Sequence, residues 1–149
     1  MKRPKGYGIH EDKVLRSHIE LSRTFLKIRA KETAWMEAQG LTLPQFAILE
    51  ALYHLGNLNV GQITKLILST PGNITVVVKN LASKKLIRVA PSEEDRRVKM
   101  LEITEEGSDL IASIFPTHVS NLSCWYDLGL NEEELEIVSK LLRKLEKAQ

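Results

Sequence analysis

Three consecutive residues, Asp95, Arg96 and Arg97, have the side chains whose types and spacing most clearly suggest chemistry in this sequence. A carboxylate can hold a guanidinium group through a forked pair of hydrogen bonds and so fix its direction. An arginine held in this way can enter a narrow minor groove of DNA, where the negative potential is enhanced. The alternative is a solvated turn, because exposed ion pairs contribute only about 0 to 1 kcal/mol.

The residues around this charged triplet predict a β-hairpin. Residues 86–89 are rich in strand-forming side chains, residues 90–97 are polar and include Pro91 and Ser92, and residues 98–103 are extended again. Two strands joined by a charged loop form a wing. We therefore expect Asp95 and its two arginine neighbours to lie at the tip of a wing.

Two short helical patterns precede the hairpin. Apolar residues recur at helical spacing from Val60 to Ile67, which predicts a first, positioning helix. Thr70 fits an N-cap, and Pro71 suits the first helical position because its missing N–H has no helical partner there. A second helix is therefore predicted to begin near Pro71.

The second helix has two different sides. One side is apolar from Ile74 to Leu81 and ends in Lys85, so it should pack inward. The other side offers small residues, amides and a cation, which suits contact with base edges in a major groove. The predicted DNA-binding residues are Thr70, Gly72, Asn73, Thr75, Val76, Lys79, Asn80, Arg96 and Arg97, with Asp95 orienting the wing.

The charge of the chain is distributed unevenly. Its 149 residues carry a formal net charge of only +2, which by itself does not indicate nucleic-acid binding. Residues 60–100, however, hold eight basic and three acidic residues, a net charge of +5, whereas residues 101–149 have a net charge of −6. Positive charge concentrated on the two helices and the wing is what contact with phosphate requires.

The order of these motifs over residues 10–147 resembles the MarR family of winged helix-turn-helix regulators. The resemblance rests on LPQFAIL at 43–49, NIT at 73–75 with the apolar residues that follow, DRR at 95–97, and LEIT at 101–104 before Gly107. It implies a symmetric dimer whose subunits each read half of a pseudo-palindrome, and a small-molecule or oxidant signal that weakens DNA binding. Carried over, Asp95 is the wing aspartate, Arg97 the minor-groove arginine and Arg96 a phosphate contact.

The sequence departs from the family pattern at several positions, which are Lys79, Asn80, Lys85, Arg88 and Val89. Lys79 stands where the family often has aspartate, which adds positive charge to the DNA face. Lys85 stands where the family often has glycine, so the second helix is expected to end without the usual left-handed glycine.

Outside this region the sequence predicts helices. Helices are predicted over about 11–38, from Thr42 or Leu43 to His54, from a cap at Thr104 to about Ser123, and from a cap at Asn131 to the C-terminal region. We therefore expect a mainly α chain with a small β-hairpin wing (α+β). Within this single chain of residues 1–149, a winged helix-turn-helix at 41–103 lies between dimerisation helices at 10–40 and 104–149.

The effector is harder to derive from the sequence. The resemblance places a ligand pocket between the DNA reader and the dimerisation helices, and a mixed aromatic and histidine lining would suit a small aromatic or phenolic effector. The same residues can equally be core and interface residues. Cys124 is expected to be a packed thiol, with an oxidation switch as the alternative. The predicted pocket residues are His18, Ser22, Phe25, Phe46, Tyr53, Ile114 and His118.

The remaining inferences concern the class of protein. No phosphate-binding glycine loop, nucleophile elbow or metal-ligand spacing is visible, so neither an enzyme nor a bound cofactor or metal is expected. A single cysteine and the lack of a signal peptide or a spanning apolar run suggest a reduced, cytoplasmic protein with no membrane partner. Residues 1–10 form a short basic arm. The expected partners are double-stranded DNA, a second copy of the chain and a small-molecule inducer; the alternative is a winged-helix protein-interaction module.

Overall fold

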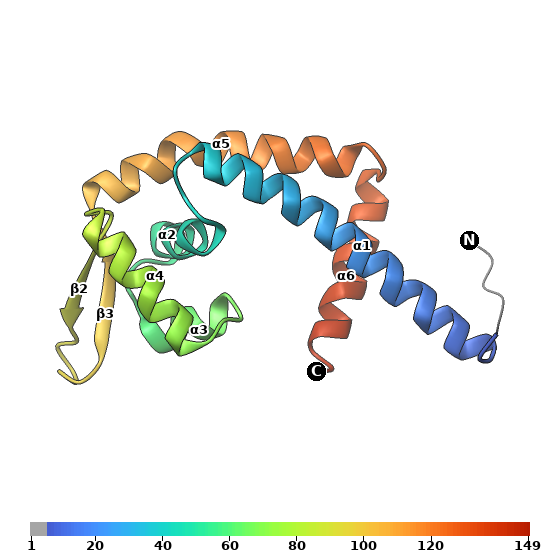
Figure 1. Cartoon of the computed structure of the whole chain (residues 1–149), viewed down its shortest axis with the longest axis horizontal. Coiled ribbons are helices and arrows are strands. Elements are labelled where there is room, and N and C mark those ends of the chain that lie inside the picture. Colours follow the sequence, from blue (N-terminus) through green and yellow to red (C-terminus); the bar gives the residue numbers. More distant parts are fainter. Residues whose placement is uncertain (1–5) are drawn as a thin grey trace. The chain divides into compact units, whose positions relative to one another are not determined.

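The computed structural model describes residues 6–149, so part of the predicted basic arm, residues 1–5, lies outside the described residues. The fold is mainly α with a small antiparallel sheet, as predicted (Figure 1). Two compact units are present, one ending at Ser108 and the other comprising Asp109–Gln149. The elements are α1 (Ile9–Ala38), α2 (Leu43–Leu55), β1 (Leu58–Asn59), α3 (Val60–Leu66), α4 (Pro71–Ser83), β2 (Ile87–Pro91), β3 (Lys99–Ile103), α5 (Glu105–Asp127) and α6 (Glu132–Glu146).

Helix α1 is a single helix of 30 residues that begins at Ile9, two residues before the predicted start. It contains neither glycine nor proline, so nothing in its sequence interrupts the hydrogen-bond ladder. The helix ends where Gly40 adopts a left-handed φ of 76° and the Leu41 N–H bonds to the Met36 carbonyl. Met36 is the only residue of α1 that is buried, so most of this helix remains exposed in the single chain.

The first unit has its own apolar core, built by α2, α3, α4 and the sheet. Capping boxes start α2 (Thr42 with Gln45) and α3 (Asn59 with Gln62), and each satisfies backbone N–H groups at its helix start. The apolar sides of these helices then meet over the sheet. The fully buried residues of this core include Ile48, Leu49, Leu52, Ile63, Ile74, Leu81 and Leu101.

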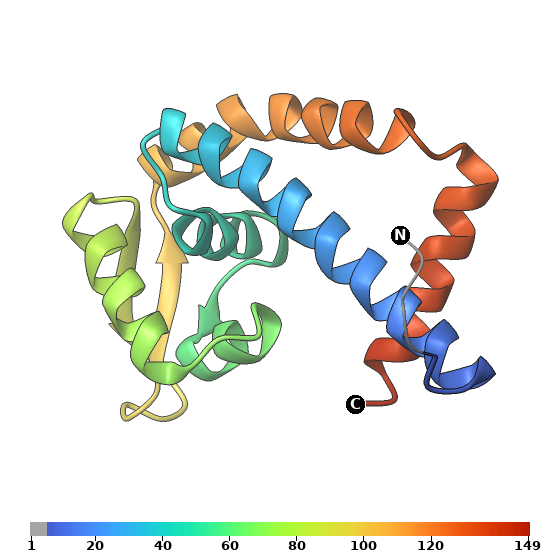
Figure 2. The same cartoon turned by 45° about the vertical axis from the view of Figure 1, so that its right-hand side comes forward.

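The sheet has three strands in the order β1-β3-β2, one more than the sequence predicted. Strand β1 is only two residues long, and it pairs Leu58 with Leu101 and Asn59 with Met100. A segment this short has no alternating pattern, so only its pairing with β3 reveals it. Strand β2 lies at an edge of the sheet, where Pro91 is tolerated although proline has no backbone N–H to donate. Figure 2 shows β3 next to the helices of this core.

The turn that ends α4 differs from the prediction. Lys85 lies beyond the last helical residue and is exposed, so its assignment to the inward side of α4 is wrong. It takes the left-handed φ of 61° that a glycine usually provides, while the Leu86 N–H bonds to the Leu81 carbonyl. A left-handed non-glycine residue costs about 1 to 2 kcal/mol. Other contacts must therefore hold this turn.

Those contacts come from the segment that starts α5. The Thr104 hydroxyl donates to the Lys85 carbonyl at 2.7 Å, and the Thr104 N–H donates to the Leu86 carbonyl at 3.1 Å. The same hydroxyl accepts from the Gly107 N–H at 3.1 Å, so Thr104 caps α5 as predicted. Gly107 is buried directly against the turn, because a Cβ atom there would collide with the Leu86 carbonyl oxygen.

The second unit consists of the rest of α5 and α6. Helix α5 continues to Asp127, four residues beyond the predicted end near Ser123. Cys124 is exposed, so the prediction of a packed thiol is wrong for the single chain. Helix α6 begins with the predicted Asn131 cap, which forms a capping box with Glu134, and none of its 15 residues is buried. Between residues 6 and 149, no helix combines the length and the apolar character needed to cross a membrane.

Gly107→Ala is expected to lower the free energy of unfolding by roughly 1 to 3 kcal/mol, as overpacked sites do. The new methyl group would press on the Leu86 carbonyl and lie 2.9 Å from the Ile103 side chain. Urea unfolding followed by circular dichroism measures the change. Gly129→Ala is the control, because a Cβ atom at Gly129 meets nothing within 4 Å. Equal stability of the Gly107 variant and the wild type would contradict the tight contact.

Candidate nucleic-acid interface

Helix α4 separates buried from exposed side chains as its sequence predicts. Thr70 caps the helix by accepting a hydrogen bond from the Asn73 N–H at 3.4 Å, and Pro71 occupies the first turn. The inward residues Ile74, Val78 and Leu81 are buried. All seven predicted contact residues at 70–80 are exposed. The core therefore fixes α4 from one side and leaves the other side free for a ligand.

The exposed face of α4 offers hydrogen-bonding groups with little internal pairing. The Thr75 hydroxyl donates to the Pro71 carbonyl at 2.9 Å, so part of its hydrogen-bonding capacity is used within the helix. Asn73 lies about two helical turns before the adjacent residues Lys79 and Asn80, on the exposed side of α4. Amide and ammonium groups at this spacing can meet the polar edges of successive base pairs.

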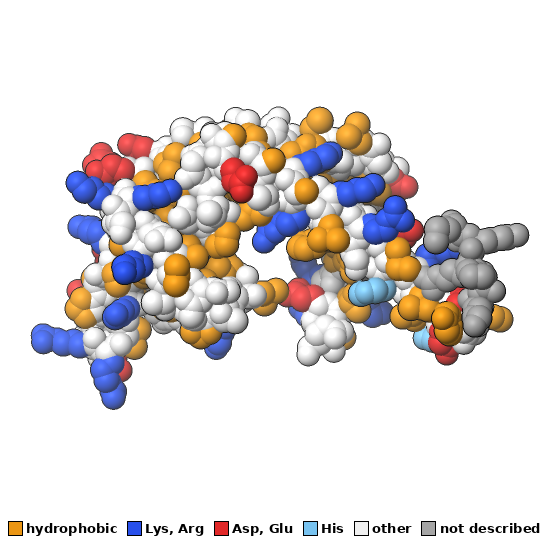
Figure 3. All heavy atoms as spheres, viewed as in Figure 1, with side chains coloured by type: hydrophobic (Ala, Val, Ile, Leu, Met, Phe, Trp, Pro, Cys, Tyr) orange, Lys and Arg blue, Asp and Glu red, His pale blue; other side chains and the backbone are white. Residues whose placement is uncertain are grey.

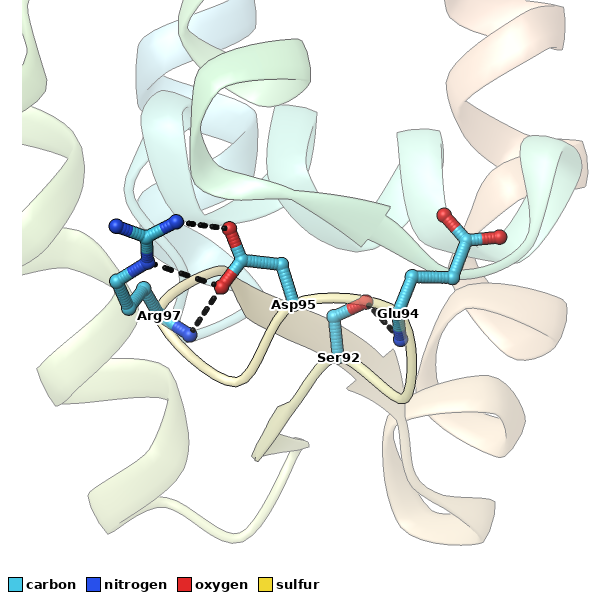
Figure 4. A network of polar contacts seen from close by, with 4 residues as sticks. All are labelled: Ser92, Glu94, Asp95 and Arg97. Carbon is cyan, nitrogen blue, oxygen red and sulfur yellow. Dashed lines mark hydrogen bonds and ion pairs between the residues drawn. The ribbon is translucent and has the colours of Figure 1, made fainter.

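The hairpin tip contains the forked ion pair predicted from the sequence, and Figure 4 shows it from close by. The Arg97 guanidinium donates from Nε to Oδ1 of Asp95 at 3.2 Å and from Nη2 to Oδ2 at 3.3 Å. The Arg97 backbone N–H also donates to Oδ1, at 3.0 Å. Three hydrogen bonds thus fix the arginine, whose side chain is still 92% exposed. No ion pair or hydrogen bond recorded within residues 6–149 holds the exposed Arg96 in this way.

Further hydrogen bonds shape the loop that carries this pair. The Ser92 N–H donates to the Val98 carbonyl at 2.8 Å, and the Val98 N–H donates to the Asp95 carbonyl at 2.8 Å. The Ser92 hydroxyl accepts from the Glu94 N–H at 3.3 Å (Figure 4). These bonds close the loop on itself, so Asp95 acts from a defined backbone.

The charge state of Asp95 follows from the same bonds. The side-chain hydrogen bonds from Arg97, followed by the one from its backbone N–H, hold the pKa of Asp95 below its ordinary value. The contribution of the ionised carboxylate to folding stability is fully present above the pKa of an unfolded aspartate, about 3.9. It is lost as the pH falls through the lower pKa that Asp95 has in the folded protein. Asp95 therefore remains charged, and able to hold Arg97, throughout the neutral range.

The reading helix and the wing face the same way. In both ribbon views the N-terminal end of α4 and the free end of the β2–β3 hairpin lie on the lower side of the first unit (Figures 1 and 2). Lysine and arginine side chains project from the free end of the hairpin in Figure 3. One surface thus combines polar side chains that fit a groove with cations that fit phosphate.

A second ion pair joins the two strands at the base of the wing. Arg88 on β2 lies 3.4 Å from the carboxylate of its cross-strand partner Glu102 on β3. The other oxygen of Glu102 accepts from the Asn57 side chain at 3.3 Å, which connects the sheet to the loop after α2. Arg88 therefore differs from Arg97, because its partner lies across the sheet rather than in the loop. No local sequence pattern predicts the Asn57–Glu102 contact, because the two residues are 45 positions apart.

Another contact that the sequence did not predict joins the ends of two helices. The Lys84 ammonium group donates to the Gly40 carbonyl at 2.9 Å. Gly40 follows α1, whose last turn contains no basic residue. Lys84 thus supplies a cation near the negative end of that helix dipole.

The predicted pocket residues have mixed environments. Phe46, Ile114 and His118 are buried and Ser22 is half-buried, whereas His18, Phe25 and Tyr53 are exposed. The Arg29 guanidinium lies 5.8 Å from the centre of the Phe25 ring, and Tyr53 meets the His54 ring edge-on. Ile114 and His118 belong to the second unit and the other five to the first. The pocket assignment remains a prediction.

An open hollow along the first half of α1 is lined by other residues. It is mainly apolar and contains none of the predicted pocket residues. Its lining residues are Tyr7, His10, Glu11, Val14, Leu15 and Ile19.

Together, a helix pair with an exposed polar reading face and a hairpin that presents a fixed arginine define a winged helix-turn-helix DNA-binding protein. The family profile described as the MarR family matches residues 41–99. The chain is also 37% identical to the HTH-type transcriptional regulator MhqR of Bacillus subtilis, over 90% of this chain and 92% of that protein. It therefore belongs to the MarR family and is a DNA-binding transcriptional regulator, not an enzyme.

Two further comparisons agree with this assignment. The HTH-type transcriptional repressor MdtR of Bacillus subtilis is 30% identical, with 90% of this chain and 87% of that protein covered. The crystal structure of AbsC, a MarR family transcriptional regulator from Streptomyces coelicolor, superposes with a TM-score of 0.82 over 97% of both chains. AbsC is only 19% identical, so this likeness concerns the fold alone.

Arg97→Ala is expected to raise the pKa of Asp95 toward its ordinary value, because it removes the guanidinium hydrogen bonds that favour the carboxylate. A carboxyl-carbon NMR titration of the free protein measures this pKa directly. Arg96→Ala removes the same charge from the next residue without breaking the fork, so it should leave the pKa nearly unchanged. An equal shift in both variants would mean that general charge, rather than the fork, lowers the pKa.

Proposed function

We propose that this regulator binds a pseudo-palindromic operator as a homodimer and represses transcription. Each α4 would enter a major groove, and each Arg97 would enter the adjacent minor groove. The observation that carries the proposal is the exposed Asp95–Arg97 fork in the loop of the β2–β3 hairpin. The free end of this hairpin lies on the same side of the first unit as the start of α4. Likeness to the repressor MdtR supports repression rather than activation. A regulator of chromosomal genes would act in the cytoplasm.

The roles of the individual residues follow from their chemistry. Asn73 and Asn80 can pair with adenine edges, and Lys79 can donate to guanine. Thr70, at the start of α4, and Arg96, at the hairpin tip, are placed to contact phosphates, which orient the protein without reading sequence. Asp95 would keep Arg97 extended before DNA arrives, so less side-chain freedom is lost on binding.

A homodimer is supported by the apolar side chains that the single chain leaves uncovered. Helix α6 has no buried residue, although its apolar side chains repeat with helical spacing. Helix α1 also exposes large apolar residues, including Phe25 at 57% and Leu26 at 64%. Two recognition helices must meet major grooves about 34 Å apart, which a two-fold dimer achieves. The exposed apolar residues of α6 are Ile137, Leu141, Leu142 and Leu145.

We further propose a small aromatic or phenolic effector that weakens DNA binding. The support is chemical: the predicted lining combines aromatic rings with imidazole groups, which suit the stacking and hydrogen bonding of such a molecule. A thermal-shift screen of aromatic acids and phenols would identify a compound that stabilises the protein and also releases it from DNA.

The direct test is binding to a duplex from the region upstream of its own gene, over a salt series, with a random duplex as control. We expect tight binding that protects about two helical turns of the DNA and weakens steeply as the salt concentration rises.

In this assay Arg97→Ala should weaken specific binding by roughly 1 to 3 kcal/mol while the dimer stays intact.

Arg88→Ala is the matched control for the wing arginine. It removes the same charge from the same hairpin, but from a residue paired with Glu102 rather than from the tip. Its effect should be small and equal on specific and random DNA. Full affinity of Arg97→Ala would remove Arg97 from the mechanism, and the absence of binding to any duplex at low salt would contradict the proposed function.

Leu141→Glu is expected to convert the dimer into monomers and to lower operator affinity by about a hundredfold or more, because the two half-sites would then bind separately. The change places a charge on the exposed apolar side of α6, where Leu141 is 60% exposed in the single chain. Light scattering gives the mass. Ser139→Glu adds the same charge at an exposed polar position of the same helix and should remain dimeric. A dimeric Leu141 variant would place the interface elsewhere.

A further inference from the structure

An apolar side chain stands in the middle of the otherwise polar face of α4. Val76 is 60% exposed, one turn after Asn73 and one turn before Lys79 and Asn80. A valine in a helix has one dominant rotamer, so its two methyl groups form a stiff apolar projection. Nothing on this side chain can form a hydrogen bond.

The fold does not account for a valine at this position. The core side of α4 consists of Ile74, Val78 and Leu81, and Val76 lies away from it. Valine is also a weaker helix former than the alanine, lysine or glutamine that would suit an exposed position. A single exposed apolar residue is ordinary on a protein surface, so a second observation is needed.

That second observation is Gly72, one turn before Val76 on the same face. Its φ lies outside the left-handed region, and a Cβ atom built there meets nothing within 4 Å. The fold therefore does not need a glycine here, in contrast to Gly107, whose missing side chain makes room for the Leu86 carbonyl. A glycine that the fold does not need, on an exposed face, is suited to the close approach of a ligand to the backbone.

We propose that Val76 recognises the methyl group of one thymine in each operator half-site, and that Gly72 lets α4 approach the bases closely enough for this contact. The inference rests on the proposed function, since it assumes α4 in a major groove. In unmodified DNA the edges of the major groove are polar except for the thymine C5 methyl group. An exposed valine among amides and a lysine fits that group alone.

The experiment begins with operator sites selected by the full-length protein from random duplex DNA. Each thymine of the selected site is then replaced in turn by uracil, which removes the methyl group and leaves the base pairing unchanged. One thymine in each half-site should respond, with a loss of about fourfold for one methyl group and about fifteenfold for the symmetric pair. The other thymines serve as internal controls.

Val76→Ala identifies the residue that makes the contact. The variant should bind the unmodified site about as weakly as the wild type binds the uracil site, and uracil at the responsive position should have little further effect. Its thermal stability should be nearly that of the wild type, because Val76 is exposed. A uniform response to uracil in the wild type, or the same loss in wild type and variant, would overturn the inference. Failure to select any site would instead overturn the proposed function and, with it, the inference.

Gly72→Ala tests the close approach separately. The variant should fold with unchanged or slightly higher stability, since alanine is the better helix former and the new methyl group meets no atom of the chain. Its operator affinity should fall by about tenfold, as overpacking at a tight contact predicts. Gly129→Ala, in equally open space in the turn after α5, should change neither property. Undiminished affinity of the Gly72 variant would overturn the role of Gly72.

Discussion

The geometry of the DNA reader depends on one close contact, between the turn that ends α4 and the segment that starts α5. Thr104 bonds to the carbonyls of Lys85 and Leu86, and Gly107 packs directly against the second of them. The turn leads from α4 into β2, and Thr104 directly follows β3. These interactions at one place thus fix the end of α4 and the base of both wing strands. They also offset the strain of the left-handed Lys85.

The wing tip is organised by a different kind of interaction. Arg97 is almost fully exposed, so its fork with Asp95 contributes little to the stability of the fold. Its effect is on direction: the carboxylate remains ionised at neutral pH and limits the orientations that the guanidinium can take. Order established before binding reduces the entropy lost on binding. The hairpin can therefore be small and polar and still present a cation at a defined place.

The helices of the chain bury apolar surface to very different extents. Helices α2, α3 and α4 share with the sheet a core of fully buried side chains. Helix α6 has no buried residue, and α1 buries only Met36. A reader with its own core keeps its shape when it meets DNA, whereas amphipathic helices with uncovered apolar sides require another surface. This contrast is the physical basis for the proposal that one set of elements reads DNA and the other forms the dimer.

Features that depend on neighbouring residues could be predicted from the sequence. The start of α4 at Thr70 and Pro71, the exposed side of that helix, the Asn131 cap and the Asp95–Arg97 fork all follow from local rules, and the structure confirms each of them. Features that depend on distant partners are seen only in the folded chain. Strand β1 exists because β3 lies beside it. Lys85 is left-handed in a turn where Thr104 binds its carbonyl and that of Leu86, and Lys84 binds Gly40 across 44 positions. Hydrogen bonds between residues far apart in the chain leave no local pattern, so the sequence could not predict them.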